Sequence, residues 1–169
     1  PLDGILVINK PEGITSFDVI RKVRHTSQVK KVGHAGTLDP FATGVLIVAI
    51  GRRFTRHLDY FQSLPKTYLT TIRLGKETNT LDTEGEITKD CPFESPPKRE
   101  EIQAILNSFI GEQFQTPPQF SAKKVNGQKA YDLARKGEVV ELAPNKITIH
   151  SIECLDYVPG PYPELTINV

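Results

Sequence analysis

The stretch Gly33-His34-Ala35-Gly36-Thr37-Leu38-Asp39-Pro40-Phe41-Ala42-Thr43-Gly44-Val45-Leu46 is rich in glycine and short polar residues and leads into an apolar run at 45–50. A short run that is apolar on both faces and rich in Val and Ile is typical of a central strand. Proline disfavours the α region for the residue before it, so Pro40 holds the backbone of Asp39 extended. The sequence therefore predicts a loop that fixes one carboxylate beside a central strand.

Strands and helices follow one another irregularly outward from this loop. Ser16 is the expected N-cap of the first helix. Apolar and alternating runs predict further strands at 4–8, 66–74, 146–157 and 165–169. Helical spacing of apolar residues predicts helices at 16–26, 54–61, 98–109 and 129–136. Because no regular βαβ repeat occurs, we expect an α+β fold with a mixed, mainly antiparallel sheet flanked by helices.

The composition is that of a soluble globular domain. The chain has 169 residues, of which 38% are hydrophobic and 24% are charged, and this argues against disordered, collagen-like and coiled-coil classes. No run reaches the ~18–20 apolar residues of a membrane span, and no signal peptide is visible. The two cysteines lie far apart, without metal-ligand spacing. We therefore expect a single domain over 1–169, in the cytoplasm, with no membrane and no metal.

The distribution of charge says more than the net charge of +1. Residues 21–66 hold nine cations against two carboxylates, and residues 115–146 hold six against three. Between them, residues 76–101 hold four cations against eight carboxylates. Two basic zones that flank an acidic one favour a positive face for a polyanion, although solvated basic helix faces would give the same count.

Asp39 has two interpretations at this stage. A carboxylate on rigid backbone between basic segments suits a nucleophile or a base. An Asp followed by Pro is also a common helix start, with Asp as the N-cap and Pro at the first helical position. Gly33 and Gly36 by themselves are a weak phosphate-loop signal, because the Lys and Ser/Thr of a P-loop are absent.

Five motifs occur in one order along most of the chain. They are residues 34–46; residues 4–11 with Gly13, Thr15 and Ser16; Lys66-Thr67-Tyr68; Arg73-Leu74-Gly75 with Thr78, Thr80, Asp82 and Gly85; and Pro117-Pro118 with Phe120, Ser121, Ala122 and Lys124, continued by Gly127, Tyr131, Ala134, Arg135 and Gly137. Together they resemble the bacterial TruB family, the tRNA pseudouridine synthases that act on the T-loop uridine. The resemblance departs from the family pattern at Asn79 and Phe120.

The resemblance implies a pseudouridine-synthase-like fold with Asp39 as the catalytic residue. The reaction breaks the N1–C1′ bond of a uridine, turns the detached base and rejoins it through C5, without a cofactor. The uridine must first be flipped out of its folded loop. Tyr68 is then expected to stack on the base, and His34 to support the space that the base has left. Whether Asp39 attacks the sugar, attacks the base or removes a ribose proton stays open.

The expected partner is tRNA, held through its T-arm stem-loop. The resemblance makes residues 115–141 an RNA-gripping insertion, whose basic residues would contact phosphates. The residues expected to touch RNA, besides His34, are Lys10, Arg52, Lys66, Lys123, Lys124, Lys129, Tyr131 and Arg135. Asp82 and Arg73 are candidate supporting residues, and an ordinary turn aspartate is the alternative for Asp82.

We expect the chain to be truncated before the end of the catalytic domain. It begins at Pro1 without Met and stops inside the expected strand 165–169. The resemblance implies a Gly-Thr-Tyr-Ile-Arg motif after Val169, whose arginine pairs with the catalytic carboxylate. A missing C-terminal polypeptide would then complete the sheet, and full turnover by residues 1–169 alone would contradict this expectation.

Two other functions remain open from the sequence. One is a non-catalytic RNA-binding module or tRNA folding helper, in which basic residues account for every effect and Asp39 for none. The other is a small-molecule enzyme that uses the glycine loop for phosphate and binds nucleotides without RNA. Replacing Asp39 by Asn and measuring conversion separately from RNA binding distinguishes them.

Overall fold

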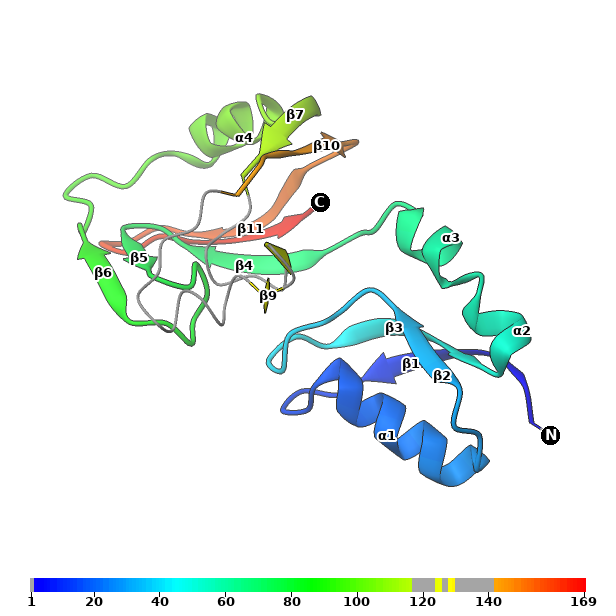
Figure 1. Ribbon diagram of the computed structural model, residues 1–169. Coiled ribbons are helices and arrows are strands. Elements are labelled where there is room, and N and C mark those ends of the chain that lie inside the picture. The colour runs from blue at the N-terminus through cyan, green and yellow to red at the C-terminus, as the bar shows by residue number, and fades with distance from the viewer. Residues whose placement is uncertain (1, 117–123, 126–127, 130–141) are drawn as a thin grey trace. The chain divides into compact units, whose positions relative to one another are not determined.

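The protein consists of two compact units, Pro1–Lys66 and Thr67–Val169 (Figure 1). The computed structural model describes residues 2–116, 124–125, 128–129 and 142–169. Helices and strands occur in both units, and every strand pairing among these residues is antiparallel. The predicted α+β class is confirmed.

The first unit is a three-stranded sheet with helices. Its strands are β1 (Gly4–Lys10), β2 (Val32–Ala35) and β3 (Gly44–Ile50), in the order β1-β3-β2. The predicted strand at 45–50 is therefore central, as expected. Its helices are α1 (Ser16–Ser27), α2 (Arg52–Thr55) and α3 (Leu58–Ser63). The helix expected at 54–61 is interrupted, because the helical hydrogen bonding stops between α2 and α3.

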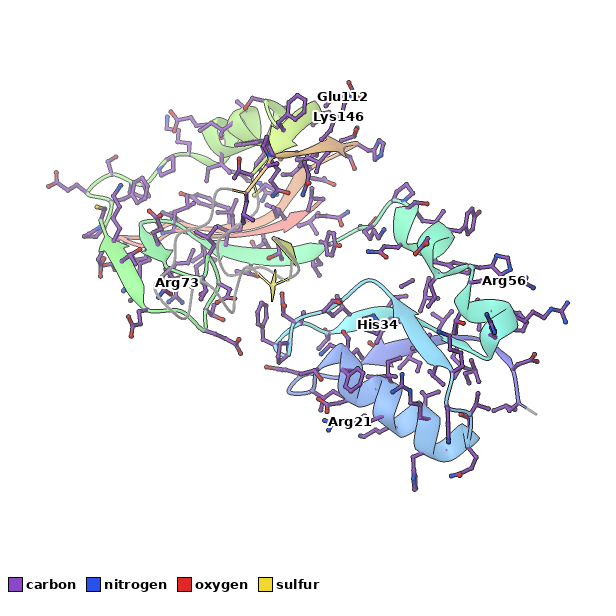
Figure 2. All side chains as sticks on the ribbon, viewed as in Figure 1. Arg21, His34, Arg56, Arg73, Glu112 and Lys146 are labelled. Atoms are coloured by element: carbon purple, nitrogen blue, oxygen red, sulfur yellow. The ribbon has the colours of Figure 1, made fainter. Side chains whose placement is uncertain are left out.

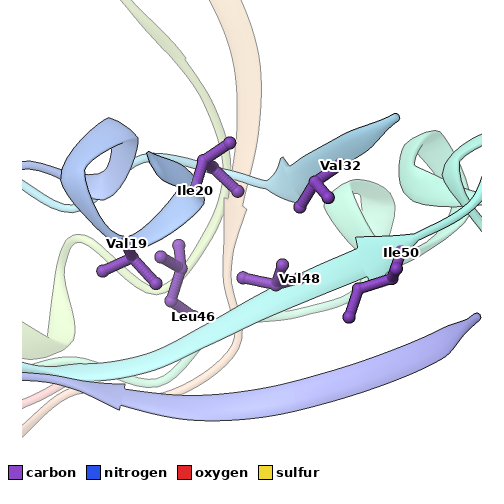
Figure 3. Close-up of a cluster of buried hydrophobic side chains, with 6 residues drawn as sticks. All are labelled: Val19, Ile20, Val32, Leu46, Val48 and Ile50. Carbon is purple, nitrogen blue, oxygen red and sulfur yellow. The ribbon is translucent and has the colours of Figure 1, made fainter. Parts of the chain in front are cut away.

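One face of this sheet carries the core, and the other is buried at Ala49 but exposed toward Val7 and Val45. Val19 and Ile20 of α1 pack on the β3 side chains that point to the same side (Figure 3). The buried cluster consists of Val19, Ile20, Val32, Leu46, Val48 and Ile50. On the opposite face Val7 and Val45 are 71% and 68% exposed. The sheet is thus apolar on both faces, and within the unit α1 covers only one of them.

The N-terminus of α1 differs from the prediction. Thr15, not Ser16, is the N-cap: its hydroxyl oxygen accepts the backbone N–H of Asp18 at 3.0 Å. The Asp18 carboxylate in turn accepts the backbone N–H of Thr15 at 2.8 Å, which completes a capping box. Ser16 is the first residue of the helix, and its hydroxyl is used elsewhere.

In its described residues, the second unit is built from small antiparallel sheets and one helix. Its strands are β4 (Leu69–Arg73), β5 (Lys76–Thr78), β6 (Ile87–Asp90), β7 (Gly111–Gln115), β8 (Lys124–Val125), β9 (Gln128–Lys129), β10 (Asn145–Ile149), β11 (Glu153–Val158) and β12 (Glu164–Asn168). They pair as β11-β12-β4, β10-β7, β5-β6 and β8-β9. An ion pair between Glu112 and Lys146, 2.8 Å long, links β7 to β10 (Figure 2).

The helix α4 (Arg99–Asn107) closes the core of this unit. Ile102 and Leu106 form one buried cluster with three residues of β11 and β12. These partners are Cys154, Leu165 and Ile167. The helix predicted at 98–109 is confirmed, with an end two residues earlier.

Several sequence predictions fail in the second unit. The strand predicted at 66–74 as half-buried is only β4, and all five of its residues are exposed. The strand predicted at 146–157 is two strands, β10 and β11, which belong to different sheets. Lys129, expected to begin a helix, lies in β9, and residues 130–136 of that helix lie outside the described residues.

The described helices are short. The longest of them, α1, has twelve residues, and the next, α4, has nine. In the part of the chain that the structure describes, no helix has the length and apolar character needed to cross a membrane.

Candidate functional site: the Asp39 loop

Asp39 lies on the loop between β2 and β3, in a tight turn. Its backbone carbonyl accepts the N–H of Ala42 at 3.1 Å, which places Pro40 at the second position of a four-residue turn. Proline favours this position because its ring presets the required φ. The chain then continues into β3, so the helix start considered for Asp39 and Pro40 does not form.

The Asp39 side chain is exposed and free of partners. Among the described residues no donor forms a hydrogen bond or an ion pair with its carboxylate. An unpaired carboxylate keeps its lone pairs available for a ligand. The group predicted to react is thus accessible, and other contacts must hold it in place.

The two neighbours of Asp39 in the sequence supply those contacts. The backbone N–H of Leu38 donates to the Ser16 hydroxyl oxygen at 2.9 Å, and that hydroxyl donates to the Leu38 carbonyl at 3.0 Å. On the other side, the Pro40 carbonyl accepts the N–H of Gly13 at 2.8 Å. Sequence reasoning placed Ser16 and Gly13 in a family motif but did not predict these contacts with the Asp39 loop, since they span more than twenty residues.

Lys10 reinforces the same anchor from inside the unit. It is fully buried, and its ammonium donates to the carbonyls of Pro11 at 2.9 Å, Ile14 at 2.8 Å and Pro40 at 3.3 Å. All three N–H donors of the ammonium are therefore used internally. This placement disagrees with the RNA contact predicted for Lys10, because the charged group does not reach the surface.

His34 lies in β2, five residues before Asp39, and is half-buried (Figure 2). Its Nδ1 is hydrogen-bonded to the carbonyl of Gly36. A carbonyl only accepts, so Nδ1 carries the proton of this hydrogen bond. This bond to the backbone orients the ring of His34.

Tyr68 belongs to the second unit and continues its sheet. Its backbone N–H donates to the Val169 carbonyl at 2.7 Å, and the Val169 N–H donates back at 3.0 Å. The side chain is 53% exposed. The backbone is thus fixed while the ring stays accessible, which suits stacking on a base.

Asp82 organises a compact turn between β5 and β6. Its Oδ1 accepts the hydroxyl of Thr80 at 2.6 Å and the N–H of Glu84 at 2.9 Å, and its carbonyl accepts the hydroxyl of Thr78 at 2.7 Å. These bonds match the turn aspartate considered as the alternative. The preceding Leu81 is exposed at a φ of 62°, in the left-handed region that branched apolar residues rarely adopt.

Three further cations predicted for the site, Arg73, Lys66 and Arg52, differ in availability. Arg73 is engaged, since its Nε donates to Oε1 of Glu164 at 2.8 Å (Figure 2). Lys66 donates to the carbonyls of Gln62 and Leu64 at the end of α3. Arg52 is exposed at the start of α2, and among the described residues it has no carboxylate partner.

The predicted RNA-gripping insertion is mostly outside the described residues. Lys124 and Lys129 lie opposite each other in the β8–β9 pair. Lys123, Tyr131 and Arg135 lie outside the described residues. Their predicted contacts with RNA remain predictions.

The arrangement around Asp39 defines a class of site. In the described part of the chain, no three His, Cys, Asp or Glu side chains are grouped as metal ligands. What is present is one free carboxylate on a loop anchored through Leu38 and Pro40. Such a group can act as a nucleophile or a base on a bound substrate.

Two solved structures share the fold of this chain. A chain in the crystal structure of a Cbf5–Nop10–Gar1 complex matches with a TM-score of 0.60 and 23% identity, over 98% of this chain and 39% of that one. A chain in the structure of an H/ACA RNP bound to a substrate RNA containing 2′-deoxyuridine matches with a TM-score of 0.56 and 20% identity, over 98% and 37%. At these identities the likeness concerns the fold.

The family is shown by sequence. The model described as TruB family pseudouridylate synthase (N terminal domain) matches residues 24–169, and the chain belongs to this family. A tRNA pseudouridine synthase B from Aquifex aeolicus is 47% identical over 94% of this chain and 54% of its own length. One from Dehalococcoides mccartyi is 52% identical over 92% and 51%. The chain thus spans about half the length of these curated relatives.

Proposed function

We propose that the protein is a pseudouridine synthase that isomerises a uridine in the T loop of tRNA. The observation that carries the proposal is the free Asp39 carboxylate on a loop anchored on both sides. Membership of the TruB family supports it, as do relatives that bear the name tRNA pseudouridine synthase B.

The reaction needs one anionic oxygen and a pocket in which the base can turn. The N1–C1′ bond breaks, the uracil rotates, and a C5–C1′ bond forms. The C5 hydrogen leaves as a proton and N1 takes up a proton, so no oxidant, reductant or cofactor is consumed. Asp39 supplies the anionic oxygen, which general principles allow to attack carbon or to take a proton.

The substrate is expected to bind with its uridine flipped out. The exposed ring of Tyr68 stacks on the base, which is worth about 1–3 kcal/mol for an aromatic platform. His34, fixed through Nδ1, supports the position that the base has left. Arg52, Lys66 and the basic residues of 115–141 contact phosphates of the T-arm.

The curated relatives extend well beyond the part that matches this chain. We propose that the corresponding polypeptide completes the sheet and provides the arginine that pairs with Asp39. We also propose a cytoplasmic location, which the two free cysteines support.

Tritium release tests the activity directly, because only a reaction at C5 frees the label. The chain, together with the polypeptide proposed to complete its sheet, is incubated with a T-arm hairpin that carries [5-³H]uridine and with a hairpin of the same composition and a scrambled loop. We expect release from the first hairpin alone, ending at a single equivalent. Binding without release would favour the non-catalytic RNA-binding module, and nucleotide binding without RNA binding would favour the small-molecule enzyme.

A further inference from the structure

We propose that Ser16 is a positioning residue for Asp39: its hydroxyl fixes the backbone of Leu38 and thereby sets where the Asp39 carboxylate is presented. The inference rests on the function proposed above. It concerns a residue that touches neither substrate nor reacting atoms.

The Ser16 hydroxyl satisfies both backbone groups of one residue. It accepts the Leu38 N–H at 2.9 Å and donates to the Leu38 carbonyl at 3.0 Å. Ser16 is 2% exposed, so water does not compete for either bond. Two bonds to the same residue restrain its rotation as well as its position, and the restrained residue directly precedes Asp39.

These bonds are not needed by the helix that carries Ser16. The N-cap of α1 is Thr15, which forms a complete capping box with Asp18. The helix is fixed independently by Val19 and Ile20, which are buried against β3 in the core of the first unit. Ser16 therefore stands on a rigid support, and its hydroxyl transmits that rigidity to the loop.

Asp39 depends on this support because its own side chain forms no hydrogen bond or ion pair with the residues that the structure describes. The other anchor acts on Pro40, through the N–H of Gly13 at 2.8 Å. Without Ser16 the chain before Asp39 is free to rotate, while the chain after it stays held. The expected loss is in turnover, since a displaced reacting group lowers the rate even when binding is intact.

The test compares three substitutions by two measurements. Ser16→Ala removes the hydroxyl, Ser16→Thr retains it, and Ser63→Ala is the matched control. Ser63 also donates its hydroxyl to a backbone carbonyl, that of Tyr60 at 2.8 Å, but at the end of α3. Amide hydrogen exchange of Leu38 is followed by NMR, and the rate and KM of tritium release are measured on the T-arm hairpin.

For Ser16→Ala we expect the Leu38 amide to exchange at least ~10-fold faster and kcat to fall ~10–100-fold, with KM within ~3-fold. Ser16→Thr should restore most of the protection of the Leu38 amide and most of kcat. Ser63→Ala should change neither the exchange rate nor kcat. Unchanged Leu38 exchange in a folded Ser16→Ala protein overturns the inference, and so does an unchanged kcat in an active protein. An inactive wild type would instead contradict the proposed function, while the exchange comparison still decides whether Ser16 orders the loop.

Discussion

Lys10 is a buried cation without a carboxylate beside it in the described part of the chain. Burying a charge is costly unless its hydrogen-bonding capacity is fully used, and here three carbonyls use it. Two of those carbonyls belong to the turn after β1 and the third belongs to Pro40, next to Asp39. One side chain thus joins the start of the unit to the loop that carries the proposed catalytic group.

Lys10→Met should lower the free energy of unfolding by about 2–4 kcal/mol, because it leaves buried carbonyls without their donor. Lys30→Met, at an exposed position, should stay within about 0.5 kcal/mol. Urea unfolding at neutral pH measures both. Equal midpoints for the two variants would show that the buried ammonium does not stabilise the loop.

Part of the site could be predicted from residue types alone. Asp39 was recognisable because Pro40 restricts its backbone, and the motif order pointed to the same residue. The residues that anchor the loop could not be predicted, because the Ser16 hydroxyl that holds Leu38 lies 22 residues earlier in the chain. Lys10 was among the residues expected to touch RNA, and only the fold shows that it is buried.

At the scale of elements, the capping box of α1 makes acid stability depend on Asp18. Hydrogen bonds from Thr15 and Arg21 hold the pKa of Asp18 well below its usual 3.8. A lowered folded-state pKa contributes stability above the unfolded pKa, and that stability is lost as the pH falls through the folded value.

Asp18→Asn should therefore lower Tm at pH 7 and flatten the decline of Tm on acidification below about pH 4. Thermal unfolding followed from pH 7 to pH 2 measures the two curves. Parallel curves for wild type and variant would mean that the cap carries no charge-dependent stability.

Gly85 lets the Asp82 turn close. A Cβ at this position would lie 2.1 Å from Oγ1 of Thr80 and 3.0 Å from its backbone nitrogen. Gly85→Ala should cost about 1–3 kcal/mol by overpacking the turn. Gly160→Ala, where a Cβ meets nothing within 4 Å, is the control and should be nearly neutral. Guanidinium unfolding of the two variants distinguishes these outcomes, and equal stability would contradict the packing argument.

Some helices and strands are predictable from their local sequence pattern, and others form only because a neighbouring strand pairs with them. β3 was predictable because it is a continuous apolar run, and α4 because its apolar residues repeat at helical spacing. β2 reads Val-Gly-His-Ala, which has no strand signal, and it forms because β3 offers it a hydrogen-bonding edge. The break between β10 and β11 could not be predicted either, because apolar residues alternate across it without interruption.

At the scale of the whole molecule, RNA binding depends on cations that are free to contact phosphates. Each such contact releases counterions from the RNA. Arg52→Gln removes an exposed guanidinium without a carboxylate partner among the described residues, so the slope of log K for hairpin binding against log salt should shrink by about 0.7–0.9. Arg73→Gln removes one already paired with Glu164 and should leave the slope nearly unchanged. Fluorescence anisotropy titrations at several salt concentrations measure both. Equal slopes for the two variants would exclude Arg52 from the RNA contact.

The central claim is that the Asp39 carboxylate performs the isomerisation. Its most direct test compares tritium release by Asp39→Asn with release by Asp59→Asn, which removes the same charge from an exposed position in α3. The account predicts a loss of about 10²–10⁴-fold or more for Asp39→Asn with hairpin binding retained, and wild-type release for Asp59→Asn. Release by Asp39→Asn at the wild-type rate would contradict it.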